Sequence, residues 1–406
     1  MTEQRNKVVL AYSGGLDTSV MIAVLRERYD LDVVAVHVDV GEAPDEGRLT
    51  ARAKEAGACD VHFVAAREEF ASSFILPALQ ANALYQQTYP LSAALSRPLI
   101  AHHLVRIAHE TGAVAVAHGA TGKGNDQVRF DLSTRALDPS LRIIAPQREH
   151  NMNRDEAMAF AAARGIPVPT TKKSPYSIDE NLWGRSMEGG VLEDLATPPP
   201  DDVWGWTTDP AKAPDAPEDL VIAFEQGVPT ALDGTALPLL ALIEKVHERA
   251  AAHGVGRIDM LENRIVGIKT RELYECPAAL VLIAAHRDLE TAVLDRPLYA
   301  FKRQVDEAYA DLIYAGHWYA PLREVLDAAV QSVQRYVTGE VTVRLFKSKA
   351  VVVARKGEGI LYDPRLSTYG ADDAFDHRAA EGWIDLEALP LSTFRRLHPV
   401  AASART

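Results

Sequence analysis

The sequence is poor in cysteine, in long apolar runs and in positive charge. Its 406 residues include two cysteines, Cys59 and Cys276, and no Cys-x-x-Cys pair, so neither a disulfide framework nor a thiolate zinc site is indicated. No apolar run approaches the roughly 18 residues of a membrane span, and we expect no secretory signal at the polar N-terminus. A formal net charge of −13 argues against a broad nucleic-acid surface. We therefore expect a cytoplasmic enzyme without nucleic-acid or membrane partners.

Lysine is absent from residues 8–53, which excludes the usual Gly-x-x-x-x-Gly-Lys-Ser/Thr phosphate loop there. Residues 8–11 are nevertheless typical of a buried strand, residues 20–29 predict a helix, and two adjacent glycines lie between them. A strand, a glycine turn and a helix N-terminus direct backbone N–H groups and a positive dipole end at one point. The segment predicts a phosphate or pyrophosphate site, and the alternative is an ordinary capped turn. The hydroxyls expected around this site belong to Ser13, Thr18 and Ser19.

The first 170 residues alternate between short apolar strands and helices. This pattern predicts a parallel sheet with helices on both faces, an α/β fold. Ligands bind at the carboxyl ends of such strands, and Ser13, Asp39 and Gly119 follow expected strand ends. The expected strands are residues 8–11, 33–38, 61–64, 114–118 and 142–146. The expected helices are residues 20–29, 49–57, 98–111 and 153–164, the last capped by Asn153.

The composition changes after residue 167. A proline-rich stretch over 198–217 is followed by a mixture of strands and long amphipathic helices, which predicts an α+β second domain. Periodicity fades near residue 367, with one short apolar helix expected over 386–397. This tail is either an arm that packs on a neighbouring subunit or a frayed terminus. The predicted domains are a nucleotide-binding domain over 1–170, a synthetase domain over 171–366 and an oligomerisation arm over 367–406.

A second polar motif begins at Gly119, directly after an expected strand. Its three glycines allow a ligand to approach the backbone closely. The residues that follow offer a hydroxyl, an amide, a carboxylate and a guanidinium, a set that can hold an amino acid by its carboxylate and its ammonium. The alternative is a glycine-rich turn with a surface ion pair. The four side chains are those of Thr121, Asn125, Asp126 and Arg129.

The string Ser-Gly-Gly-Leu-Asp-Thr-Ser at residues 13–19 resembles the pyrophosphate loop of the N-type ATP pyrophosphatases. These enzymes cut ATP between its α- and β-phosphates. The resemblance implies an adenine-nucleotide α-hydrolase-like domain, in which Asp17 would help to place Mg²⁺ on the pyrophosphate. No histidine pair has metal-ligand spacing, so Mg²⁺ that arrives with ATP is the only metal we expect.

With the second motif added, the chain resembles the argininosuccinate synthases over nearly its whole length to about residue 370. The resemblance includes the strings at residues 97–101, 173–179, 188–194, 254–257, 262–264 and 269–275. It implies an ATP site formed by Ala11, Tyr12, Ser13, Gly14, Gly15, Leu16, Asp17, Thr18, Ser19, Val38 and Gly119. It implies an aspartate site formed by Thr121, Asn125 and Asp126. It implies a citrulline site formed by Tyr89, Asn125, Arg129, Ser177, Ser186, Glu262 and Tyr274.

The same resemblance implies the activity, an ATP-dependent ligation of L-citrulline and L-aspartate to argininosuccinate in arginine biosynthesis. AMP and pyrophosphate would be released after a citrullyl-adenylate forms, and Asp17, Lys123 and Asp126 would be the catalytic residues. The implied assembly is a homotetramer. Two other interpretations remain, a tRNA-modifying thiolase or lysidine synthetase and a nucleotide sensor without turnover. The acidic charge and isolated cysteines oppose the first, and the second amino-acid motif opposes the sensor.

Two positions depart from the pattern of that family. Ala93 and Ala94 occupy positions where the family often has Thr-Ser, which puts one citrulline contact in question. Glu42 occupies a position where glutamine is frequent, and we expect this surface change to have little effect. His118, at a strand end, either orients a phosphate or is a satisfied structural histidine.

Overall fold

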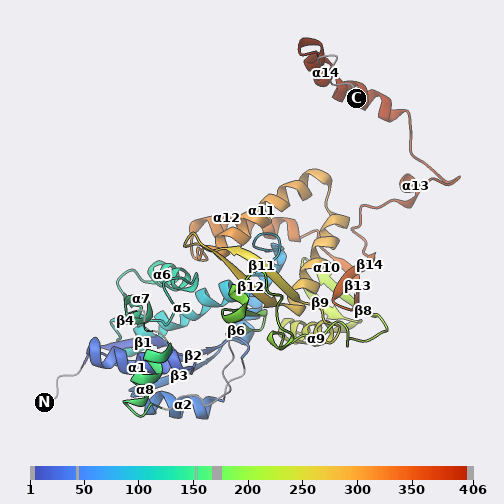
Figure 1. Cartoon of the computed structure of the whole chain (residues 1–406). Coiled ribbons are helices and arrows are strands. Elements are labelled where there is room, and N and C mark those ends of the chain that lie inside the picture. The colour runs from blue at the N-terminus through green and yellow to red at the C-terminus, as the bar shows by residue number, and fades with distance from the viewer. Residues whose placement is uncertain (1–4, 43–44, 151, 153, 167–175, 400–406) are drawn as a thin grey trace. The chain divides into compact units, whose positions relative to one another are not determined.

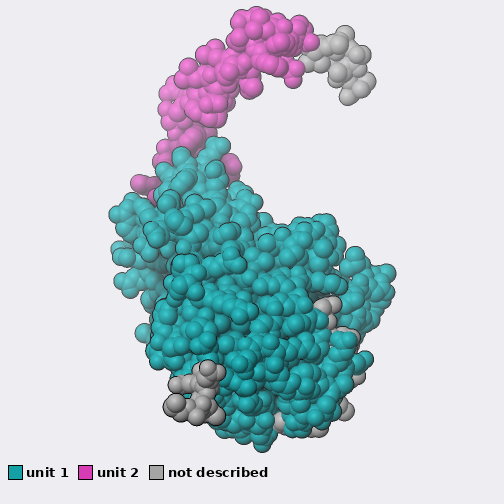
Figure 2. Space-filling view, turned by 90° about the vertical axis from the view of Figure 1, so that its left-hand side faces the viewer, with its two compact units in different colours: residues 1–359 teal, residues 360–406 magenta. Residues whose placement is uncertain are grey.

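The computed structural model describes residues 5–42, 45–150, 152, 154–166 and 176–399. Asn153, the expected boundary at residue 170 and the start of the 173–179 string lie outside these residues. The chain divides into two compact units, residues 1–359 and residues 360–406, which are coloured separately in Figure 2. Among the described residues, no helix combines the length and apolar character needed to cross a membrane.

A five-stranded parallel sheet forms the first part of the larger unit (Figure 1). Its order is β3-β2-β1-β4-β5, and Val9 of the central strand pairs with Val34 and Val116 on its two sides. The predicted α/β fold with a parallel sheet is therefore confirmed. The strands are β1 (Lys7–Ala11), β2 (Asp32–Asp39), β3 (Asp60–Ala65), β4 (Ala115–Ala117) and β5 (Arg142–Ile144).

Helices cover both faces of this sheet because its strands are apolar on both sides. Val8 and Leu10 pack into one core with the helices α1, α2 and α8, whereas Val9 points to the other face, where α5 packs against β1. The helices of this part are α1 (Leu16–Arg28), α2 (Glu46–Glu55), α3 (Arg67–Glu69), α4 (Leu76–Gln80), α5 (Ser92–Thr111), α6 (Asp126–Leu137), α7 (Pro146–His150) and α8 (Arg154–Ala162), with a π-helical turn, η1 (Phe70–Ile75), before α4.

Three helices of this part begin earlier in the structure than the sequence predicts. The first helix begins at Leu16, because Gly15 supplies the extended cap residue and the pyrophosphate-type loop is shorter than expected. The second begins at Glu46, because the Asp45 side chain accepts from Arg48 N over 3.0 Å and caps it. The third, α5, begins six residues before the expected start, so Pro98 lies inside the helix. A proline inside a helix removes one backbone hydrogen bond. Here Pro98 is buried, and the packing around it compensates for that loss.

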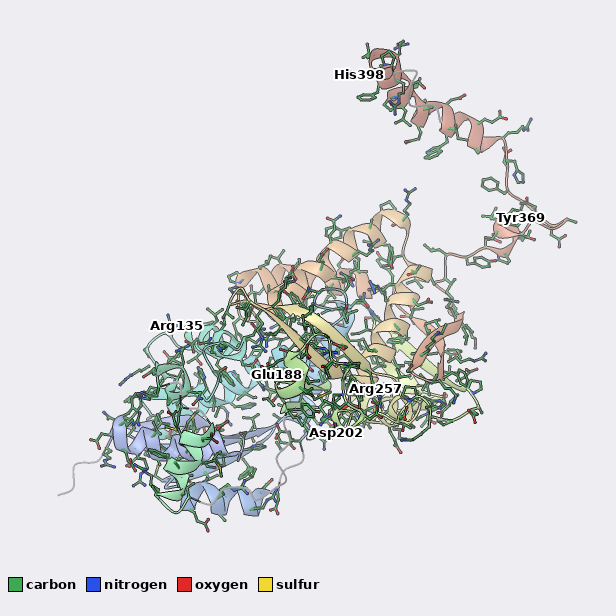
Figure 3. All side chains as sticks on the ribbon, in the orientation of Figure 1. Arg135, Glu188, Asp202, Arg257, Tyr369 and His398 are labelled. Carbon is green, nitrogen blue, oxygen red and sulfur yellow. The ribbon has the colours of Figure 1, made fainter. Side chains whose placement is uncertain are left out.

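Two antiparallel sheets follow in the larger unit, and the predicted α+β character of this region is confirmed. One has the order β11-β12-β7-β6, and Figure 3 labels Glu188 at the end of β7 and Arg257 at the start of β11. The other has the order β10-β9-β8-β13-β14. The strands are β6 (Ser177–Asn181), β7 (Gly184–Glu188), β8 (Glu218–Glu225), β9 (Val228–Leu232), β10 (Thr235–Ala236), β11 (Arg257–Asn263), β12 (Lys269–Glu275), β13 (Gly339–Phe346) and β14 (Lys349–Lys356).

Long helices complete this region, and two short 3₁₀ turns precede β8, the second of them within the proline-rich stretch. The helices are α9 (Leu239–Ala252), α10 (Pro277–Val293), α11 (Arg296–Tyr314) and α12 (Pro321–Gln334), and the turns are η2 (Gly190–Glu193) and η3 (Asp201–Val203). The smaller unit contains α13 (Pro364–Ser367) and α14 (Ala379–Leu397). The last helix is longer than the predicted 386–397 segment and continues through Pro390.

Candidate active site

The glycine loop after β1 folds as a network of short hydroxyl contacts. Ser13 Oγ lies 3.2 Å from Thr18 Oγ1, and Tyr12 Oη lies 3.2 Å from Ser19 Oγ. Gly14 has a φ of +77°, and a Cβ built there would lie 2.0 Å from Leu49 Cδ2. Glycine suits this position, because residues with a side chain rarely adopt this backbone conformation and a Cβ would displace the Leu49 side chain of α2.

A cation that the sequence motif lacks is supplied from α2. The guanidinium of Arg52 donates from Nη1 to the carbonyl oxygen of Gly14. Nothing in the local sequence indicates this contact, because 38 residues separate the two positions and only the fold brings them together. The loop therefore has a positive charge beside it although it contains no lysine.

A cleft of about 670 Å³ opens at the carboxyl end of the parallel sheet. Eight of the predicted ATP residues line it, as do Asp126, Ser177 and Ser186 from the two predicted amino-acid sites. The eight are Ala11, Tyr12, Ser13, Gly15, Asp17, Thr18, Val38 and Gly119. The predicted ATP residues that do not line the cleft are Gly14, Leu16 and Ser19. Gly14 and Ser19 are buried, so they contribute to the packing of the loop and not to the cleft surface.

Of the residues that depart from the family pattern, Ala93 and Glu42 line this cleft, whereas Ala94 is buried and does not. The backbone N–H of Ala93 donates to Tyr89 Oη over 3.0 Å. Glu42 is exposed, as expected of a surface position, and it also lines the cleft. Desolvation within the cleft and the nearby charge of Asp179 raise the pKa of Glu42 to about 7.

A chain of ion pairs crosses the cleft wall. Arg97 donates from Nε to Asp126 Oδ2 and pairs through Nη2 with Asp179 Oδ2, each over 2.8 Å. Arg129 donates from Nη1 to the other oxygen of Asp126, also over 2.8 Å. Burial opposes ionisation of Asp126, but the two guanidinium groups outweigh it and lower the pKa of this carboxyl to about 2. Asp126 is therefore ionised throughout the physiological range.

A buried polar cluster lies beside this chain. Glu262 accepts from Tyr274 Oη and from Tyr314 Oη, each over 2.5 Å, and from Asn125 Nδ2 over 3.2 Å. Tyr274 stacks on Tyr89 with ring centroids 4.0 Å apart. Burial raises the pKa of Tyr274 and of Tyr314, so both remain neutral donors. The structure thus brings together predicted citrulline residues from widely separated segments of the chain.

One guanidinium nitrogen of Arg129 has no hydrogen-bond partner in this cluster. Its Nε donates to the carbonyl oxygen of Tyr314 over 3.1 Å, whereas its buried Nη2 has no hydrogen-bond partner among the described residues. Leaving a buried donor unpaired is costly. The free N–H groups of Nη2 are suited to an anionic ligand group.

The register of the four-stranded sheet explains how the later residues reach the site. Ser186 of β7 pairs with Asp179 of β6 and with Tyr274 of β12. Paired residues share one face of a sheet, so these three side chains face the same side. Ser186 Oγ lies 3.4 Å from the Asp179 carbonyl oxygen, and Ser177 is exposed at the cleft.

The glycine-rich loop after β4 is exposed but anchored at both ends. Thr121 and Lys123 are exposed. The Lys123 carbonyl oxygen accepts from Arg264 Nη1 over 3.2 Å, and Asn125 Oδ1 accepts from the Ile265 N–H over 2.9 Å. The hairpin between β11 and β12 therefore holds this loop, an interaction that sequence reasoning missed.

His118 fixes the start of the same loop. Its Nε2 lies 2.9 Å from Asp131 Oδ1, and its Nδ1 accepts from the Ala120 N–H over 3.3 Å. The ring is buried and stacked on Phe130. Of the two interpretations from the sequence, the satisfied structural histidine fits these contacts.

Two family profiles match the chain, "Arginosuccinate synthase N-terminal HUP domain" over residues 7–167 and "Arginosuccinate synthase C-terminal domain" over residues 176–394. The chain belongs to the argininosuccinate synthase family. It is 54% identical over 391 residues to the argininosuccinate synthase of Symbiobacterium thermophilum, covering 96% of this chain and 98% of that protein. It is 52% identical over 390 residues to that of Bacillus subtilis, with 96% of each chain covered. The family resemblance and the enzyme class predicted from the sequence are confirmed.

The argininosuccinate synthase profiles meet near the predicted boundary at residue 170, whereas the compact units divide at residue 359. The three-part division of the chain stays a prediction. Among the described residues, no group of three or more His, Cys, Asp or Glu side chains is arranged to hold a metal ion.

Proposed function

We propose that this enzyme ligates L-citrulline and L-aspartate to argininosuccinate, with release of AMP and pyrophosphate, through a citrullyl-adenylate. It would act as a cytoplasmic homotetramer in arginine biosynthesis. One observation carries the proposal. The cluster around Glu262 and the free Nη2 of Arg129 offer complementary groups for an amino acid, and Asp126 joins them to a cleft that begins at the glycine loop.

The loop at residues 13–19 suits the pyrophosphate of ATP. Backbone N–H groups at the start of α1, the hydroxyls of Ser13 and Thr18 and the charge of Arg52 would face the leaving group. Asp17 is exposed and lines the same cleft, so its carboxylate fits a Mg²⁺ ion that arrives with ATP. When bound, Mg²⁺ would neutralise phosphate charge.

Citrulline would be held by both of its charged groups, the carboxylate and the ammonium. Arg129 Nη2 fits the citrulline carboxylate, because Nε and Nη1 already donate to Tyr314 and Asp126. Glu262 fits the ammonium. Ser177, Ser186 and the stacked rings of Tyr89 and Tyr274 would surround the rest of the molecule.

Aspartate would bind through Thr121, Asn125 and Asp126. Each oxygen of Asp126 already accepts from an arginine, so a substrate ammonium would be a third partner of that carboxylate. With a pKa of about 2, Asp126 is too weak a base to remove a proton from that ammonium at neutral pH. Its role is then to orient the amine, and the amine loses its proton to another acceptor.

The reaction would proceed in two displacements. The ureido oxygen of citrulline attacks the α-phosphorus of ATP, the bond to the bridging oxygen breaks, and pyrophosphate leaves. The aspartate amine then attacks the ureido carbon, and AMP departs with the former ureido oxygen. The exposed Lys123 would offset charge on the phosphoryl oxygens. No enzyme nucleophile is required, and catalysis comes from positioning and charge stabilisation.

Labelled citrulline tests the proposal directly. Citrulline that carries heavy oxygen in the ureido group is expected to give labelled AMP and unlabelled argininosuccinate, measured by mass spectrometry. Unlabelled AMP, or ADP and phosphate as products, would exclude the adenylate.

Asp17→Asn is expected to slow AMP formation sharply while leaving the circular dichroism spectrum unchanged. Full activity in this variant would remove Asp17 from the site.

A further inference from the structure

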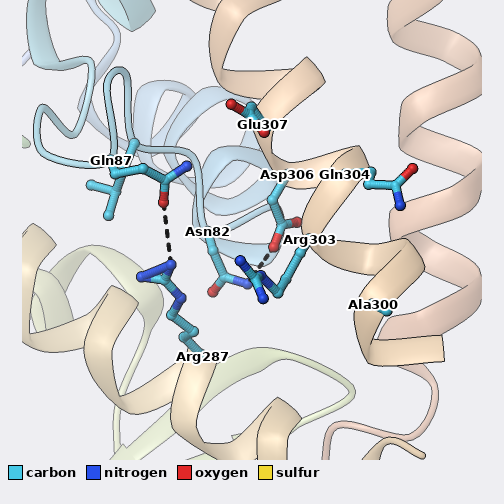
Figure 4. A pocket seen from close by; sticks show the side chains of 9 residues that line it. Asn82, Gln87, Arg287, Ala300, Arg303, Gln304, Asp306 and Glu307 are labelled. Atoms are coloured by element: carbon cyan, nitrogen blue, oxygen red, sulfur yellow. Dashed lines mark hydrogen bonds between the residues drawn. The ribbon is translucent and has the colours of Figure 1, made fainter. Parts of the chain in front are cut away.

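A second cavity of about 330 Å³ lies among α10, α11 and the loop before α5, and nothing described above uses it. Figure 4 shows Arg303 and Asp306 extending from α11 toward Asn82, with Arg287 and Gln87 on the opposite side. The lining is strongly charged for a cavity of this size.

The floor of the cavity is a buried network with an excess of negative charge. Lys302, which is fully buried, pairs with Glu290 over 2.9 Å and with Asp306 over 2.5 Å. Asn82 Nδ2 donates to both of these carboxylates, over 2.7 and 3.0 Å. Burial lowers the pKa of the neighbouring His286, so this ring adds no charge. One ammonium thus faces two carboxylates, and Asp306 opens into the cavity.

The walls carry two arginines that lack a carboxylate partner. Arg287 donates from Nη2 to Gln87 Oε1 over 3.3 Å and makes no ion pair within the described part of the chain. Arg303 makes neither a hydrogen bond nor an ion pair to any residue that the structure describes. Glu307, on the same helix, also lines the cavity. The cavity therefore presents two guanidinium groups without a carboxylate partner for an anion, and for a cation it presents Glu307 together with Asp306, which also accepts from Lys302 and Asn82.

We propose that this cavity binds a zwitterionic α-amino acid, with its carboxylate on Arg287 and Arg303 and its ammonium on Asp306 and Glu307. The charges match such a ligand, because Lys302, Arg287 and Arg303 are balanced by Glu290, Asp306 and Glu307. Neither a simple anion nor a simple cation satisfies both sets of groups. Paired arginines recognise a carboxylate by geometry as well as by charge.

The same elements connect this cavity to the cluster around Glu262. Tyr85 follows Asn82 in the loop, stacks on Tyr314 with ring centroids 3.4 Å apart, and donates from Oη to the Asn263 carbonyl oxygen over 2.8 Å. Tyr314 is the last residue of α11, which also carries Arg303 and Asp306. A ligand in the cavity therefore changes the affinity for citrulline through this loop and helix. This coupling rests on the proposed function, whereas binding in the cavity does not.

Binding is tested by calorimetry on the full chain without turnover. Each common L-amino acid is titrated into the wild type and into Arg303→Gln and Arg287→Gln, with Arg296→Gln as the matched control. Arg296 is an exposed arginine of the same helix that does not line the cavity. At least one amino acid is expected to lose affinity by about tenfold or more in the two cavity variants only. If no amino acid shows this difference, the proposal is overturned.

Matched analogues then test whether the site recognises both the carboxylate and the ammonium of its ligand. For L-histidine, the analogues are histamine, which lacks the carboxylate, and 3-(imidazol-4-yl)propanoate, which lacks the ammonium; equivalent pairs serve for any other amino acid that binds. Both analogues are expected to bind much more weakly than the amino acid. Equal binding of either analogue would show a site for a simple cation or a simple anion and would overturn the zwitterion assignment.

Kinetics test the coupling. A saturating amount of the bound amino acid is expected to change the KM for citrulline at least about threefold in the wild type and not in Arg303→Gln. An unchanged KM would overturn the coupling. If the chain makes no argininosuccinate at all, the proposed function fails, while the calorimetric result still decides whether the cavity binds an amino acid.

Discussion

Arg129 and Asp126 form an ion pair of 2.8 Å at the start of α6, three residues apart, and this pair joins the two candidate amino-acid sites. On one side, Asp126 also binds Arg97, which extends to Asp179 on the four-stranded sheet. On the other side, Arg129 reaches the Tyr314 carbonyl oxygen and the cluster around Glu262. The ion pair therefore links the parallel sheet to the second region of the larger unit.

Removing the charge of Asp126 is expected to destabilise the fold. Asp126→Asn leaves Arg97 and Arg129 buried without their shared carboxylate, and breaking a buried pair in this way costs about 3–5 kcal/mol. The loss is measured by urea unfolding. Glu110→Gln is the control, because Glu110 forms an exposed pair with Arg106 on α5 and such pairs contribute about 0–1 kcal/mol. Equal losses in the two variants would contradict this account.

Substitutions of Asp126 and Arg129 are expected to affect different substrates. Asp126→Asn is expected to raise mainly the KM for aspartate, because it removes the partner of the substrate ammonium. Arg129→Ala is expected to raise mainly the KM for citrulline, because it removes the free Nη2 donor. Steady-state kinetics with each substrate varied separately measure both. Equal effects on both substrates in both variants would refute the assignment.

Glu42 predicts a pH dependence of ATP binding. Its pKa is raised to about 7, so the carboxyl is largely neutral at pH 6 and ionised at pH 8, where its charge repels the polyphosphate. The KM for ATP is expected to rise over this range in the wild type and to stay flatter in Glu42→Gln. Since the folded-state pKa exceeds the ordinary value of 4.5, ionisation also lowers the free energy of unfolding as the pH rises from 4.5 through 7. Parallel pH profiles of the wild type and Glu42→Gln would contradict both expectations.

Tyr314 is expected to act through its hydroxyl. Tyr314→Phe removes the hydroxyl that donates to Glu262 and accepts from the Asn125 amide. Leaving a buried partner without its hydrogen bond costs about 1–3 kcal/mol. The KM for citrulline should rise by about tenfold. Tyr309→Phe on the same helix is the matched control, because Tyr309 Oη donates to Asp327, away from the cluster. Tyr309→Phe should lower the free energy of unfolding without changing the KM for citrulline.

The C-terminal arm is expected to serve assembly. Its last helix leaves large apolar side chains more than half exposed, namely Trp383, Ile384, Leu386, Leu389, Leu391, Phe394 and Leu397, and such a face is typical of a buried contact between subunits. A chain that ends at residue 366 should sediment as a smaller assembly while it still binds ATP by calorimetry. An unchanged sedimentation coefficient would refute this role.

The sequence by itself determined the local elements and the identity of the family. Apolar strands that alternate with helices are sufficient to predict a parallel sheet, because both faces of such strands must be buried. The glycine loop was predictable for a related reason, since Gly14 and its neighbours encode the turn within a few residues. The same was true of the motif after Gly119, which places Asn125, Asp126 and Arg129 within one loop and one helical turn.

The tertiary structure alone decided which distant side chains complete the site. Arg52, Tyr314 and the hairpin residue Arg264 meet the loops across 38 to 189 residues of sequence, and no local pattern encodes such a meeting. Glu42 was expected at the surface and is exposed, but only the fold places it among cleft residues that come from other segments. Side-chain convergence depends on how sheets and helices pack, and packing is fixed by the whole chain rather than by any short stretch of it.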